Sequence, residues 1–428
     1  MTLFNQLKNQ LKIQLDQIIE HKNVNNGLII LHAEQSCSIE NKSLLSWLKA
    51  QNSYPKYYWQ NRINTLTLTT IGSVKSFNNI QQAQQFSHKN HCTLVGGIPF
   101  SGEACFILPR LLLAKKEQKV TACLVIDGNH LIQEKTIIDT LFENFEQFAE
   151  LEKIQCNLLK SMPYTNFEQW SKNIQNAIQH IEKGTFNKVV LANATDFICE
   201  NSISAYDLLA LSQQKNKHCF HFLWQETNEK AFMGSSPERL YKREQQQFYT
   251  EALAGTVAVT DNQKQTKENA RWLLCDPKNN LENQYVVDDI SENLNAYSHH
   301  IIIGEPHLKR LPNVQHLRRL IEMELKENIS DTECLQQIHP TAAVAGYPRN
   351  TAIPFILQTE NFERNWYSGT LGFLNTEQAE FCVTLRSALI QQNKITVYAG
   401  AGIMRNSTPE SEWQEIQHKA LAMIKLLK

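Results

Sequence analysis

The residues best suited to chemistry gather near the C-terminal end of the sequence. Gly400 and Gly402 lie in YAGAG, and Glu412, Glu415 and Lys419 follow in ESEWQEIQHK. If this second segment is a helix, spacings of three and four residues place both carboxylates and the lysine on one face. Glycines leave their backbone N–H groups open to a closely approaching anion. The pattern predicts a strand, a glycine turn and a helix that hold a small anion with a hard cation. An ordinary exposed helix rich in Glu and Lys fits it equally well.

Other candidates stand where apolar runs begin or end. Lys188 opens the run KVVLA, Glu238 follows Pro237 in GSSPERL, and Arg386 lies in the run from 380 to 390, which we expect to be one strand. A lysine at a strand edge usually points to solvent, whereas one buried beside an apolar strand can serve as a base. An arginine inside an apolar strand is costly unless it meets an anion.

Hydrophobic periodicity indicates the elements that must position these groups. It predicts helices over residues 2–20, 141–154, 167–183 and 264–297, the last interrupted at Pro277. Short apolar runs that end in small residues predict strands, including 28–32, 66–71, 106–113, 120–126, 188–192, 219–224, 248–256, 366–374 and 395–399.

Composition limits the classes of function. A net charge of -1 gives no long-range reason to bind nucleic acid or an anionic membrane. No apolar run approaches the roughly 18 residues of a membrane span, and no signal-peptide pattern opens the chain. The ten cysteines form no CxxC pair, which favours reduced thiols in a cytoplasmic protein over a zinc cage. A weak junction near 156–165 suggests an N-terminal part, 1–155, and a catalytic region, 156–428, in one composite domain.

Several separated segments carry a family resemblance. They are NKVVLAN at 187–193, GSSPERL at 234–240, TEALAGT at 250–256, DPKNNLENQYVV at 276–287, HPTAAVAGYPR at 339–349, WYSGTLGF at 366–373 and CVTLRSAL at 382–389. In this order and spacing, the chain resembles the chorismate-utilising enzymes, and within them the isochorismate synthases. The N-terminal third is similar more loosely, through YPKYYWQNR, GGIPF and ILPR.

The resemblance implies an α+β fold of two face-to-face packed antiparallel β-sheets flanked by helices, with the active site in the cleft between them. It implies an enzyme that uses Mg²⁺ and converts chorismate reversibly to isochorismate. We expect a monomer or a homodimer. The product could feed menaquinone or siderophore biosynthesis, and the longer N-terminal region favours menaquinone.

The resemblance also implies a role for each candidate. Lys188 corresponds to the base that activates a water molecule, and Glu238 to the acid that protonates the departing 4-hydroxyl. Glu282 and Glu415 correspond to Mg²⁺ ligands, with Glu412 in support. The implied substrate-binding residues are Arg386, Gly400, Lys419, Tyr367, Ala254, Gly255, Thr256 and His339.

Two positions discriminate among the relatives. The ammonia-using members typically carry glutamine at Lys188, and the aminodeoxychorismate type carries a nucleophilic lysine at Ala254, so water is the expected nucleophile. A salicylate synthase, which also eliminates pyruvate, and a catalytically silent ligand-binding subunit remain alternatives. Asn193 departs from the arginine that many relatives have there.

Overall fold

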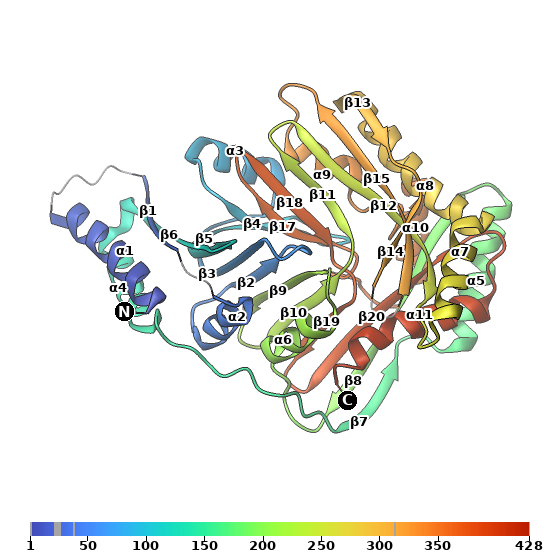
Figure 1. The fold of residues 1–428 in the computed structure, drawn as a ribbon, viewed down its shortest axis with the longest axis horizontal. Helices are drawn as coiled ribbons and strands as arrows, with labels where there is room; N and C mark the ends of the chain where they lie inside the picture. The colour runs from blue at the N-terminus through green and yellow to red at the C-terminus, as the bar shows by residue number, and fades with distance from the viewer. Residues whose placement is uncertain (1, 21–26, 37–38, 312–313, 428) are drawn as a thin grey trace.

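A computed structural model of the protein describes residues 2–20, 27–36, 39–311 and 314–427. Within these ranges 20 strands form one hydrogen-bonded network, and the helices lie outside it (Figure 1). The helices are α1 (Leu3–Glu20), α2 (Asn41–Ala50), α3 (Ile80–Asn90), α4 (Leu131–Asn144), α5 (Phe167–Glu182), α6 (Ala205–Lys215), α7 (Gln263–Cys275), α8 (Pro277–Leu294), α9 (Asp331–Ile338), α10 (Arg349–Thr359) and α11 (Pro409–Ile424), with short 3-10 turns at Gly128–His130 and Asn295–Tyr297.

The network divides into two sheets at strand β5 (Cys105–Lys116). One edge of β5 pairs with β3 (Leu66–Phe77), and the other pairs first with β4 (Leu94–Ile98) and then with β6 (Lys119–Asp127). The outer edge of β6 pairs with β1 (Leu28–Ser36). All of these pairs are antiparallel, so β5 is the strand from which both sheets extend.

The first sheet extends from β3 and the second from β4. The first continues through β2 (Lys56–Gln60), β9 (Phe220–Thr227), β10 (Lys230–Ser236), β19 (Ser387–Gln391), β20 (Lys394–Ile403) and β8 (Lys188–Cys199), with β7 (Leu158–Pro163) and β16 (Gly346–Tyr347) beyond. The second continues through β17 (Thr370–Leu374), β18 (Gln378–Val383), β11 (Arg239–Glu244), β12 (Gln247–Ala258) and β15 (Val314–Leu325), with β13 (Ser298–Ile303) and β14 (His307–Arg310). Strands from both sides of residue 155 therefore pair with one another.

An aromatic core holds the two sheets face to face. Trp59 of the first sheet is buried with its ring centroid 5.4 Å from that of Phe373 in the second. Tyr57 is also buried, and its hydroxyl donates a hydrogen bond of 2.8 Å to the Gly372 carbonyl across the interface. Large rings bury much apolar area, and a buried hydroxyl needs a partner, so these contacts fix the spacing of the sheets. The predicted fold class is confirmed.

The chain crosses between the sheets at two adjacent places. Residues 237–238 join β10 of the first sheet to β11 of the second, and residues 384–386 join β18 back to β19. The two crossings are hydrogen-bonded to each other, because Val383 N–H donates to Glu238 C=O at 3.2 Å and Ser235 N–H donates to Arg386 C=O at 3.1 Å. Two predicted site residues thus lie on crossing segments.

Helices α8 and α11 carry the other predicted acids, and both begin with the same signal. The Asp276 side chain accepts from Asn279 N–H before Pro277, and the Thr408 side chain accepts from Ser411 N–H before Pro409. A capping oxygen satisfies a free helical N–H, and proline at the first position needs none. Both helices lie at the right of Figure 1, α8 against β12 and α11 against β20.

Three predicted elements differ from the structure. The helix expected at 141–154 is α4, which ends at Asn144, because Ala149 N–H then bonds to Ser46 C=O and the chain follows α2. The strand expected at 380–390 is broken at the second crossing, where Arg386 has a positive φ of 47°. Gly400 and Gly402 form no turn, because β20 continues through both beside β8.

One expectation about the cysteines is wrong. The structure joins Cys156 and Cys199 in a disulfide, with Cα atoms 5.8 Å apart, because β7 pairs with β8 and brings residue 158 opposite Cys199. Seven other described cysteines are free thiols. Among the described helices, none is long and apolar enough to cross a membrane.

Close packing of β17 and β18 yields a stability prediction. A Cβ at Gly372 would lie 2.0 Å from the Glu380 carbonyl oxygen, a backbone atom that cannot move without opening the strand pair. We expect Gly372→Ala to lower the free energy of unfolding by about 1–3 kcal/mol, the usual cost of overpacking. Urea denaturation followed by circular dichroism measures this. Gly304→Ala is the control, since its nearest neighbour would be at 3.4 Å; equal stability of both variants would contradict the prediction.

Candidate active site

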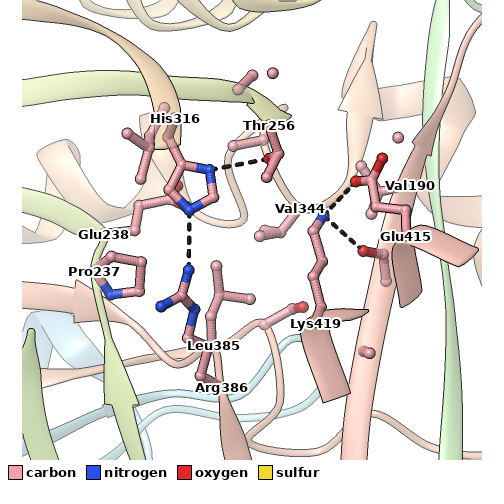
Figure 2. A pocket seen from close by; sticks show the side chains of 18 of the residues that line it. Val190, Pro237, Glu238, Thr256, His316, Val344, Leu385, Arg386, Glu415 and Lys419 are labelled. Atoms are coloured by element: carbon pink, nitrogen blue, oxygen red, sulfur yellow. Dashed lines mark hydrogen bonds and ion pairs between the residues drawn. The ribbon is translucent and has the colours of Figure 1, made fainter. Parts of the chain in front are cut away.

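A cavity of about 100 Å³ lies where the two crossing segments, β8, β12 and β20 meet helices α8 and α11 (Figure 2). A wider cavity of about 390 Å³, between the end of β12 and the face of α11, adjoins it and shares five lining residues with it. The two cavities therefore meet beside α11.

Most of the predicted site residues meet in the inner cavity, although they come from seven separate segments. Those that line it are Glu238, Ala254, Gly255, Thr256, Glu282, Tyr367, Arg386, Gly400, Glu415 and Lys419. Lys188 lies directly beneath its wall, and Glu412 and His339 do not line it.

Lys188 is the first residue of β8 and is fully buried. Its Nζ lies 3.1 Å from Glu282 Oε1, and among the described residues it makes no hydrogen bond. Gly402 makes this contact possible, since a Cβ there would lie 2.5 Å from Glu282 Oε1 and 3.0 Å from Lys188 Cε. Both Gly402 and Glu282 line the cavity, so the amine is held at its edge with hydrogen-bonding capacity unused.

Glu238 lies on the first crossing segment and is buried. Its N–H donates to Ser236 Oγ at 3.2 Å, and among the described residues its carboxyl has no hydrogen bond or ion pair. Burial, and then the charge of Glu251, raises the pKa of the Glu238 carboxyl to about 8. A carboxyl with this pKa is protonated at pH 7 and can donate its proton.

Arg386, His316 and Thr256 form a chain of contacts along one wall (Figure 2). Arg386 Nη2 lies 3.0 Å from His316 Nε2, and His316 Nδ1 lies 3.0 Å from Thr256 Oγ1. A guanidinium can only donate, so Nε2 accepts and Nδ1 carries the proton. Burial, and then Arg386, lowers the pKa of His316 well below its ordinary value, which keeps the ring neutral. The Thr256 hydroxyl then accepts from His316 and has its own proton free.

His316 is a cavity residue that the sequence analysis missed. It lies on β15 directly opposite Thr256, next to a register shift between Leu253 and Thr256 in β12. A shift of this kind re-aims side chains locally. No strand was predicted at 314–325, and only the pairing of β12 with β15 brings His316 to the site.

The α11 face presents Lys419 between an acid and the sheet. Lys419 Nζ lies 2.6 Å from Glu415 Oε1 and donates to the Gly400 carbonyl at 2.9 Å. A Cβ at Gly400 would lie 2.9 Å from Tyr367 Oη. The absence of a side chain at Gly400 therefore gives Tyr367 room at the cavity wall, where a turn had been expected.

The predicted metal ligands fit a hard cation in chemistry. Glu282 and Glu415 line the cavity, whereas Glu412 is buried beside it with Oε1 3.2 Å from Lys278 Nζ. No group of three or more His, Cys, Asp or Glu side chains converges on a metal position in the part of the chain that the structure describes. Mg²⁺ is usually held by one or two carboxylates, with water and substrate oxygens completing the shell. Two cavity-lining carboxylates meet that requirement.

The predicted substrate-binding residue His339 and the unusual Asn193 do not line the cavity. His339 Nε2 lies 3.0 Å from the Pro99 carbonyl oxygen, and burial lowers the pKa of His339 to about 4, so it is a neutral structural histidine and not a cavity residue. Asn193 departs from the family pattern, and its side chain binds the backbone of Thr165. It accepts a hydrogen bond from Thr165 N–H at 3.0 Å and donates one to the Thr165 carbonyl at 2.8 Å.

Comparison with known proteins agrees with this site. Residues 99–428 match the family model described as chorismate binding enzyme. The chain is 41% identical over 389 residues to isochorismate synthase MenF of Pasteurella multocida (strain Pm70), covering 90% of each chain. Its structure superposes with a TM-score of 0.89 and 36% identity on MenF, the menaquinone-specific isochorismate synthase of Escherichia coli, covering 98% of this chain and 100% of the other.

The fold extends to a more distant relative. Anthranilate synthase component I of Streptococcus pneumoniae TIGR4 superposes with a TM-score of 0.68 at 18% identity, covering 93% of this chain and 92% of the other. At this identity the likeness concerns the fold alone. The family model and the MenF relatives, which span most of the chain, carry the assignment: the chain belongs to the family of chorismate binding enzymes.

Proposed function

We propose that the protein is an isochorismate synthase, an isomerase that converts chorismate reversibly to isochorismate. The observation that carries the proposal is that one cavity has a buried amine, Lys188, at its edge, a protonated acid, Glu238, in its wall, and cationic groups beside them. The MenF relatives, which are isochorismate synthases and match most of the chain, support it.

The reaction moves a hydroxyl from one ring carbon to another. Lys188 removes a proton from a water molecule whose oxygen bonds to C2 of chorismate. The ring double bonds shift, the C4–O bond breaks, and Glu238 donates its proton to the departing hydroxyl, which leaves as water. One water enters and one leaves, so the atoms balance. The reverse reaction uses the same groups in exchanged roles.

Chorismate carries two carboxylates, and the cavity presents donors for them. Arg386 and Lys419 supply positive charge, and the Thr256 hydroxyl and Tyr367 supply further polar contacts. Because His316 already accepts from Arg386, the guanidinium is held in one orientation before substrate binds. Pre-oriented donors lower the cost of binding a charged ligand.

Glu282 and Glu415 would hold Mg²⁺, with Glu412 adjacent. When bound, Mg²⁺ neutralises the negative charge between these carboxylates and the substrate and acts as a Lewis acid. Glu282 contacts Lys188 and Glu415 contacts Lys419, so each proposed ligand also keeps an active-site lysine in place.

We also propose that the product feeds menaquinone formation, because the similar E. coli enzyme is a menaquinone-specific isochorismate synthase. Salicylate synthesis and a silent subunit are the alternatives that product analysis decides. Chromatography of a chorismate reaction gives isochorismate alone under the proposal, and salicylate with pyruvate, or unchanged chorismate, under the alternatives.

Removal of either reacting group tests the mechanism. We expect Lys188→Ala and Glu238→Gln each to lower kcat at least about 100-fold, the usual contribution of a positioned acid or base. Isochorismate formation is measured by chromatography, with circular dichroism to confirm folding. Lys172→Ala is the control, because Lys172 is an exposed lysine that pairs with Glu168 on α5. Near wild-type turnover in either test variant would exclude the assigned role.

The pKa of Glu238 predicts an alkaline limb in the rate profile. The acid works in its protonated form, and a pKa raised to about 8 keeps it protonated below that pH. The forward kcat should therefore fall above about pH 8, approaching tenfold per pH unit. Measurement of kcat from mildly acidic to alkaline pH in saturating chorismate checks this. A fall that begins near the ordinary glutamate pKa would show that Glu238 is ionised during turnover.

Metal removal gives a prediction with two readouts. EDTA should abolish turnover and added Mg²⁺ should restore it. Isothermal titration calorimetry of Mg²⁺ into the protein, with and without chorismate, should show binding that Glu282→Gln weakens at least about tenfold. Glu377→Gln, at an exposed position in the β17–β18 turn, is the matched control. Mg²⁺ binding that is unaltered by Glu282→Gln would place the ion elsewhere.

A further inference from the structure

A buried cluster of charges lies next to Glu238, centred on Glu251 of β12. Arg62 Nη2 donates to Glu251 Oε2 at 2.8 Å. Lys309 Nζ lies 3.7 Å from Oε1, and Arg318 Nη1 lies 3.6 Å from Oε2. Glu251 is 3% exposed and lines neither cavity, so the reaction described above does not use it.

The same cluster holds both peptide groups of Glu238. On the N-terminal side, the Pro237 carbonyl accepts from Arg62 Nη1 at 3.2 Å and also from Lys309 Nζ. On the C-terminal side, Arg239 N–H donates to Glu251 Oε1 at 3.2 Å. The backbone on either side of the proton donor is therefore tied to one ion cluster, directly or through the cations that Glu251 binds.

Glu251 remains ionised in this setting. Burial alone would raise the pKa of its carboxyl, but Lys309, Arg62 and Arg239 more than offset burial and hold that pKa well below its usual range. A fixed negative charge disfavours a second one nearby. Around Glu238, burial and then Glu251 raise the pKa of its carboxyl, whereas Lys188, Lys309 and Lys419 lower it.

We propose that Glu251 is a positioning residue for Glu238: with Arg62 and Lys309 it anchors the peptide groups on both sides of the proton donor and places a fixed negative charge beside it. The inference rests on the proposed function, in which Glu238 donates a proton. Glu251 itself touches neither substrate nor metal.

Two substitutions with opposite expected effects test the proposal. Glu251→Gln removes the negative charge and leaves its cations, so the pKa of Glu238 should fall by roughly one to three units. The alkaline limb of kcat then moves to lower pH by the same amount, so kcat measured just below about pH 8 drops severalfold. Lys309→Met removes a cation that lowers the pKa of Glu238, so the alkaline limb of kcat in this variant should move to higher pH. General damage to the fold would not produce shifts of opposite sign.

A second readout does not depend on catalysis. Difference infrared spectroscopy follows the protonated-carboxyl band that Glu238→Gln abolishes, as pH is raised, in the wild type and in both variants. If chorismate is not turned over, the proposed function fails but this titration still reports on Glu238. An infrared pKa that Glu251→Gln leaves unchanged or raises would overturn the inference.

The matched control is Asp331→Asn. Asp331 is another buried acid with an arginine partner, Arg243 Nη2 at 2.7 Å, and it lines neither cavity. Its removal also leaves a buried cation unpaired, so it reproduces the loss of stability without the position beside Glu238. We expect Asp331→Asn to lower the stability of the protein and to leave the alkaline limb of kcat unshifted. If this limb moves as far as it does in Glu251→Gln, the inference is also overturned.

Discussion

The contact between Lys188 and Glu282 is the constraint on which the site depends. It joins β8 of the first sheet to α8, the helix that packs against β12 of the second sheet, and the Lys188 amine is fully buried there. Burying a polar group costs free energy unless it has a partner, so this contact requires the two sheets to keep one spacing. The aromatic core around Trp59 and Phe373 supplies that spacing.

The two crossings between the sheets explain why the reacting groups meet. A carboxyl donor and a guanidinium stand on neighbouring segments, at Glu238 and Arg386, where the chain leaves one sheet for the other. Backbone hydrogen bonds from the flanking strands hold these segments in place, whereas a free loop would have no such bonds. Precise placement of catalytic groups requires such support. The base comes from the start of β8 and the proposed metal ligands come from two helices, so strands, helices and the crossing segments all contribute to the walls of the cavity.

The fold class and most of the site could be predicted because their residues stand in linear motifs. Lys188, Glu238, Glu282 and Glu415 each lie in a recognisable segment, and the structure brings them to one cavity or its edge. His316 could not be predicted in the same way, because its position depends on the register of β15 against β12, which is a tertiary property. The glycines of β20 were misread for a related reason. Their small size accommodates Tyr367 and the Lys188–Glu282 pair, and only the packed neighbours reveal that requirement.

The contacts of Arg62 extend the catalytic unit toward the N-terminus, beyond the region that the family model matches. The family model starts at residue 99, yet Arg62 lies well before it and contacts both Glu251 and the Pro237 carbonyl. The part of the chain before residue 99 therefore contributes directly to the residues that hold the active site, although the family model does not include it. Any fragment cut at the boundary of the recognised family region would lack a cation of the buried Glu251 cluster. Recombination between relatives should accordingly exchange the β2–β3 turn, which carries Arg62, together with β11, β12 and β14.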